Sequence, residues 1–202
     1  ENGVTVKDGA TVIIKSDENI GNTTISGTIT VEKGAVLKIQ SDVTLNSDII
    51  AKTVEVENDA TVSGTGNIVL EGGTASGNVD AYYKITKDAV SGGYVNLTYK
   101  VGNDTYKIQG DVIPVGSTVV VKATPQSDYK VSSGTYIIGD DATKFSIENF
   151  SSSTAGVEVT GEFTPNNGPI KVAVTFAYVS SGGGDHGGGG GGGGGGGSSS
   201  SS

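Results

Sequence analysis

The sequence predicts an all-β protein that consists of a short parallel β-helix, an Ig-like β-sandwich and a Gly/Ser-rich tail. A 25-residue pattern is written almost three times between Val4 and Leu70. Apolar and polar residues alternate over many short segments, and turn residues separate these segments. No segment carries the apolar stripe of an amphipathic helix. We therefore expect three domains, a β-helix over residues 1–80, a β-sandwich over 81–180 and a tail over 181–202.

The first domain is predicted from columns of apolar residues that recur at the repeat period. About 25 residues make one coil of a three-sided parallel β-helix, so we expect a solenoid of about three 25-residue rungs spaced by about 4.8 Å. Gly9, Gly34 and Asp59 share one turn position, where we expect a positive φ. The columns expected to stack inward are Val4, Ile29 and Val54; Val6, Val31 and Val56; Ala10, Ala35 and Ala60; and Val12, Leu37 and Val62.

The second domain begins where the repeat is lost. The solenoid is expected to end between Gly77 and Asp80, because Tyr82–Ile85 breaks the pattern. Strands of alternating polarity follow, with turn signals between them at the spacing typical of a sandwich. The predicted strands are Tyr94–Val101, Thr105–Gln109, Thr118–Ala123, Lys130–Val131, Thr135–Ile138, Lys144–Glu148, Gly156–Phe163 and Ile170–Tyr178.

The third predicted domain is the low-complexity end of the chain. Gly182–Ser202 contains two glycine runs that flank Asp185 and His186, followed by five serines. Such a composition favours a flexible coil when it is alone in water.

Composition and charge narrow the functional classes. All 13 basic residues are lysine, and the net charge of −9 argues against a nucleic-acid partner, because phosphates would be repelled. No apolar run is long enough to span a bilayer, so membrane insertion is not expected. The chain has no cysteine and no methionine, even at position 1. We expect an extracellular protein that begins after a processed signal peptide, or an excised fragment.

Four segments of the second domain carry a recognisable motif: Val115–Pro125, Asp128–Val131, Phe163–Pro165 and Ile170–Phe176. They resemble the internalin-B-repeat-like and related repeat domains of bacterial surface proteins. The similarity covers roughly residues 86–178, with Asp128 in place of the usual glycine and an insertion at 166–168. The Gly/Ser tail is similar to the hinge that precedes S-layer homology modules in Gram-positive surface proteins. The resemblance implies display at a bacterial cell surface and no catalytic chemistry.

No catalytic, cofactor-binding or metal-binding residues are predicted. Polysaccharide lyases with β-helix folds use a basic residue, usually arginine, beside a carboxylate cluster that binds calcium. This chain has no arginine. The only histidine, His186, lies in the glycine tail, which cannot preorganise a site. We interpret Asn103-Asp104 and Asp140-Asp141 as turn residues rather than calcium ligands, and expect no isopeptide bond at Lys100. The solenoid carboxylates are expected on a solvated surface: Asp8, Asp17, Glu18, Glu32, Asp42, Asp48, Glu55 and Glu57.

These observations favour a non-enzymatic extracellular structural protein of a bacterial surface. It would be a stalk attached to the cell envelope or a self-assembling filament subunit, a homo-oligomer joined head to tail into fibres. One alternative is a carbohydrate- or host-binding adhesin module, which should present an exposed aromatic platform, although the absence of tryptophan counts against glycan binding. Another is a degenerate polysaccharide-active β-helix enzyme.

Overall fold

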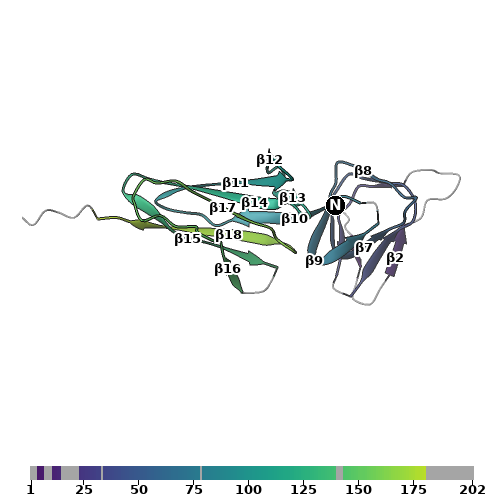
Figure 1. Ribbon diagram of the computed structural model, residues 1–202. Helices are drawn as coiled ribbons and strands as arrows, with labels where there is room; N and C mark the ends of the chain where they lie inside the picture. The colour runs from purple at the N-terminus through teal and green to yellow at the C-terminus, as the bar shows by residue number, and fades with distance from the viewer. Residues whose placement is uncertain are drawn as a thin grey trace, which may run out of the picture.

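The structure is a computed structural model that describes residues 4–6, 11–14, 23–32, 34–77, 79–139 and 143–180. The described residues form strands and no helix, which confirms the all-β prediction, and nothing in them could cross a membrane as a long apolar helix. The predicted tail, with Asp185 and His186, lies outside the described residues. We call β1–β9 the curled region and β10–β18 the two-layer region (Figure 1).

The strands of the curled region are β1 (Val4–Val6), β2 (Thr11–Ile14), β3 (Thr23–Ile25), β4 (Ile29–Val31), β5 (Val36–Ile39), β6 (Val43–Leu45), β7 (Ile49–Val56), β8 (Val62–Gly64) and β9 (Ile68–Ser76). The strands of the two-layer region are β10 (Ala81–Lys87), β11 (Gly93–Val101), β12 (Asp104–Lys107), β13 (Val112–Pro114), β14 (Thr118–Pro125), β15 (Tyr129–Ile138), β16 (Lys144–Ser146), β17 (Val159–Phe163) and β18 (Ile170–Tyr178).

The curled region is built from parallel strands. One series runs β1-β4-β7-β9, a second joins β2 to β5 and β5 to β7, and a third runs β3-β6-β8. The strands curl into an open half-barrel, and the closed three-sided coil expected from the repeat is not shown. Parallel pairing of successive sequence repeats is therefore present, in strands that form an open half-barrel.

The rung length differs from the predicted 25 residues after the first step. Val4 pairs with Ile29, as the repeat predicts, but Ile29 then pairs with Ile49 and not with Val54. The reason is that β7 runs without a turn along both β4 and β5, so Val54 pairs with Leu37. The next rung lacks the turn that separates β4 from β5, and this rung is therefore shorter. The predicted third-rung columns of Val54, Val56 and Val62 are therefore wrong.

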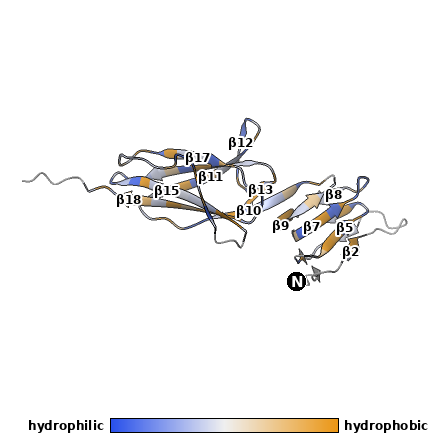
Figure 2. Ribbon diagram, turned by 60° about the horizontal axis from the view of Figure 1, so that its bottom comes forward, coloured by the Kyte–Doolittle hydropathy of each residue, from blue (hydrophilic) through white to orange (hydrophobic). Residues whose placement is uncertain are grey.

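Apolar residues on the inner face of each strand form the core of the curled region. Leu37, Ile39 and Leu45 are completely buried, while residues between them along the strands are partly exposed. This alternation of burial follows from the two-residue period of a strand. Figure 2 shows both hydrophobic and hydrophilic residues along β7. Gly34 has the positive φ expected of its turn, at 82°, whereas Asp59 does not adopt one and Gly9 lies outside the described residues.

The two-layer region consists of two sheets that face each other. One contains β12-β11-β14-β17, all antiparallel, and the other contains β10-β18-β15-β16. Their inner faces share one core, in which the rings of Tyr136 and Phe163 stack across the layers with centroids 3.8 Å apart. Most strands lie where the sequence predicts them, but Lys130–Val131 and Thr135–Ile138 belong to the single strand β15, which has a register shift after Val131.

The strand β10 joins the two regions. From the sequence, its residues were predicted only to break the repeat. Its first residues, Ala81 and Tyr82, pair in parallel with β9, and its last three pair in parallel with β18. One hydrogen-bonded sheet therefore continues from β1 to β16. The regions consequently lie end to end (Figure 1).

Further contacts hold this junction. The Gly72 amide, in an irregular part of β9, donates to the Gly168 carbonyl oxygen at 2.8 Å, and the Tyr83 hydroxyl donates to the Asn166 carbonyl oxygen at 3.1 Å. Tyr83 is only 5% exposed. A Cβ at Gly168 would lie 3.1 Å from the carbonyl oxygen of Leu70 on β9, so glycine permits the two regions to approach closely.

Candidate ligand-binding site

The solenoid carboxylates within the described residues serve the backbone and neighbouring side chains. Oδ1 of Asp42 accepts from the Thr61 amide, and Oδ1 of Asp48 accepts from the Asn67 amide, both at 2.8 Å. Each aspartate thus fixes the corner of the next rung. The remaining described carboxylates also have partners: Glu55 with Lys38 at 3.0 Å, Glu57 with the Gln40 amide at 2.6 Å, and Glu32, which is also engaged.

The other candidate metal-binding and catalytic residues do not form a cluster among the described residues. Asp8, Asp17, Glu18, Asp140, Asp141 and His186 lie outside the described residues. Asp104 begins β12 after the turn at Gly102, and Lys100 forms an ion pair with Glu162. Within the described ranges, no three His, Asp or Glu residues gather as metal ligands would.

The structure instead gathers tyrosines at the junction of the two regions. Tyr82 comes from the first half of β10, and Tyr99 and Tyr106 come from the β11–β12 hairpin. The hairpin register places Tyr99 directly opposite Tyr106, and their rings stack with centroids 5.4 Å apart and an interplanar angle of 22°. Tyr106 is 45% exposed, so this aromatic platform is open to solvent on one side.

The tyrosines line a hollow of about 370 Å³. Its other walls come from the curled region and from the β12–β13 connection: Asn67, Lys107, Gln109, Val112 and Pro114. A second hollow of about 260 Å³ shares Asn67 and Tyr82 with the first and extends along β8 past Thr61, Ser63 and Asp80. Both hollows are lined by these two residues, and we refer to the pair of hollows as the junction groove.

Two amide side chains provide hydrogen-bonding capacity in this groove. The backbone of Asn67 is held at both ends, since its amide donates to Asp48 and its carbonyl accepts from the Ile49 amide at 2.9 Å. The side chains of Asn67 and Gln109 make no hydrogen bond to another described residue. Each therefore offers one acceptor and two donor hydrogens to a ligand.

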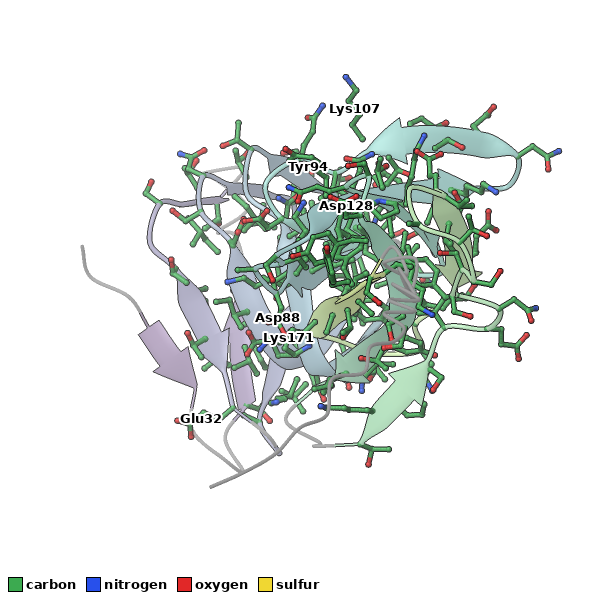
Figure 3. All side chains as sticks on the ribbon, turned by 90° about the vertical axis from the view of Figure 1, so that its left-hand side faces the viewer. Glu32, Asp88, Tyr94, Lys107, Asp128 and Lys171 are labelled. Carbon is green, nitrogen blue, oxygen red and sulfur yellow. The ribbon has the colours of Figure 1, made fainter. Side chains whose placement is uncertain are left out.

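The surroundings of the Tyr82 phenol favour its neutral form. Burial raises the pKa of Tyr82 above its usual value of 10.0, and the nearby Asp80 carboxylate and the Tyr99 hydroxyl raise it further. The cationic end of Lys107 projects outward from the edge of β12 (Figure 3). The groove thus presents neutral aromatic and amide groups, with one lysine and one carboxylate at its margins.

Sequence reasoning missed this groove, although one part of it had a signal. The turn around Gly102-Asn103-Asp104 is centred between Tyr99 and Tyr106, and this spacing predicts that the two rings face each other across a hairpin. The contributions of Asn67 and Tyr82 depend on the β9–β10 pairing and have no local signal. No known protein family, curated protein or solved structure matches the chain.

Proposed function

We propose that this protein is a non-enzymatic structural protein of a bacterial exterior, which acts as a stalk or as a filament subunit. The carrying observation is the continuous hydrogen-bonded sheet through β9, β10 and β18. Stalks and filaments must transmit orientation along their length, and backbone pairing across a domain junction restricts bending far more than a flexible linker does. A short closed β-helix joined to an Ig-like sandwich would suit this role, and the resemblance of residues 86–178 to surface repeat domains supports extracellular display.

The rigidity of the junction can be measured with spin labels, because the absence of cysteine allows specific labelling. Asn58 lies on an exposed turn of the curled region, and Lys144 is exposed on β16. We expect the double variant Asn58→Cys/Lys144→Cys to give one narrow distance distribution by double electron–electron resonance. The matched control, Asp104→Cys/Lys144→Cys, has both labels in the two-layer region.

The comparison of widths decides the result. If the two regions form a rigid unit, the distribution across the junction should be about as narrow as that of the control pair. A distribution that is much broader, or that has several peaks, would mean that the regions move independently. The stalk proposal would then lose its main support.

The filament form is supported by the outermost described rung. Val12, Ile14 and Ile25 are only partly buried, whereas their neighbours in the next rung, Leu37, Ile39 and Leu45, are completely buried. Among the described residues, no strand pairs with the outer edges of β2 and β3. Unpaired strand edges with apolar side chains are templates for association, and an unlike surface on a second copy would extend the contact into a fibre.

Negative-stain microscopy of the intact protein tests the filament form. We expect fibres at high protein concentration, and loss of these fibres in the variant Ile13→Lys. Ile13 is 51% exposed on β2, and a lysine there would charge the open edge without disturbing the core. Protein that remains monomeric by light scattering at high concentration would leave only the stalk.

The two alternative functions have different support. The adhesin alternative is favoured by the open Tyr99–Tyr106 platform. The degenerate enzyme alternative has no support from Asp42, Asp48 or Glu55, because their carboxylates are engaged in hydrogen bonds and an ion pair. Release of unsaturated oligosaccharides from pectin or alginate by the pure protein would overturn the non-enzymatic assignment.

A further inference from the structure

We propose that the junction groove binds a short neutral oligosaccharide. This binding activity goes beyond the structural role and does not depend on filament formation. Three features of the groove suit such a ligand: an aromatic platform, amide side chains without a hydrogen bond to another described residue, and a nearly uncharged lining.

The aromatic platform provides the apolar contact. One face of a pyranose ring carries mainly C–H groups, and it packs on the π face of an aromatic side chain, which is apolar with a slight negative charge. Tyr106 is 45% exposed while its ring is held parallel to Tyr99 by the stack. Little conformational freedom would be lost on binding, because the hairpin already fixes the ring.

The amide side chains provide the polar contacts. Sugar hydroxyls both donate and accept hydrogen bonds, and the side chains of Asn67 and Gln109 can do the same. Since both are free of hydrogen bonds to other described residues, a ligand need not displace an existing protein contact. Tyr82, whose raised pKa keeps its hydroxyl protonated, lines both hollows and adds a further donor.

The charge of the groove selects neutral sugars. Lys107 and Asp80 are the charged residues among those that line the two hollows, and they carry opposite signs. The whole chain has a net charge of −9, which repels uronate or sulfated chains. The hollow beside the tyrosines, of about 370 Å³, falls within the roughly 300–1,000 Å³ typical of ligand sites. The neighbouring hollow along β8 offers room for further sugar units.

The test is titration of the intact protein with neutral hexaoses by isothermal titration calorimetry. We would use β-1,4-glucan, β-1,3-glucan and α-mannan hexaoses, with an oligogalacturonate of equal length as the acidic probe. At least one neutral hexaose should bind, with a Kd below about 1 mM, and the acidic chain should bind at least tenfold more weakly. Failure of every neutral hexaose to bind, or tighter binding of the acidic chain, overturns the proposal.

Matched tyrosine variants locate the binding site. Tyr106→Ala should weaken binding at least tenfold and leave the thermal unfolding temperature nearly unchanged, because the side chain lies at an exposed edge. Tyr94→Ala is the control, since Tyr94 lies on the same strand as Tyr99 but at its other end, is 71% exposed, and lies outside the groove. Equal affinity in the Tyr106 variant and the intact protein, or equal losses in both variants, would overturn the assignment to this groove.

Discussion

Two isoleucines in one column of the curled region allow the same substitution to be compared inside the stack and at its open end. Ile14 on β2 pairs directly with Ile39 on β5, and both side chains belong to the inward-facing column. Ile39 is completely buried between Ile14 and Val56, while Ile14 is only partly buried. We therefore expect Ile39→Ala to destabilise the protein much more than Ile14→Ala.

The magnitudes follow from the burial of the two side chains. Removing three carbons from a fully buried isoleucine costs about 2–5 kcal/mol, because the transfer free energy is lost and a cavity remains. At the open end the same change costs roughly 1–2 kcal/mol, since water already reaches the side chain and can fill the space. With an m-value of about 2 kcal/mol/M, the urea midpoints should fall by roughly 1–2.5 M for Ile39→Ala and by less than about 1 M for Ile14→Ala.

The assay is urea unfolding followed by far-UV circular dichroism, because the tyrosines lie outside the curled region. It should be carried out at low micromolar concentration, where association is weakest. Equal losses of stability in the two variants would refute the assignment of β2 to an open end. A cost for Ile14→Ala that rises with protein concentration would instead indicate that a second copy covers this rung.

Three further predictions concern other parts of the fold. Val31→Asp should abolish folding of the curled region by circular dichroism, because it buries an unpaired charge at a position only 2% exposed, whereas the outward-facing Thr30→Asp should cost less than about 1 kcal/mol. Gly73→Ala should lower the thermal unfolding temperature sharply, since its Cβ would lie 1.4 Å from the Lys52 carbonyl oxygen. Burial raises the pKa of Tyr82 in the folded state, so the unfolded chain loses this proton at a lower pH, and the free energy of unfolding should fall as the pH rises above 10.0. Tyr82→Phe should reduce this fall, as measured by urea titrations at pH 9 and 11.

The sequence by itself determined the elements of this protein well. Alternation in Val119–Ala123 and Val172–Tyr178 predicts strands because one face of each is buried, and the structure places β14 and β18 there. The first step of the repeat was also predictable, since Val4 pairs with Ile29 and Val12 with Leu37 in the expected register. These features are local, or they repeat between adjacent rungs, so the pattern of side chains is enough to reveal them.

The tertiary structure alone decided how the rungs continue and where the groove forms. Val54 matches Ile29 in the repeat, yet it pairs with Leu37. The reason is that the single strand β7 continues straight, whereas the preceding rung has a turn between β4 and β5. Apolar columns are interchangeable to a first approximation, so hydrophobicity cannot distinguish these two registers. The junction groove depends on the pairing of β10 with β9, which brings Asn67 and Tyr82 beside the Tyr99–Tyr106 platform. The side chains of these two strands do not reveal which strand each one pairs with, so the sequence does not predict this contact.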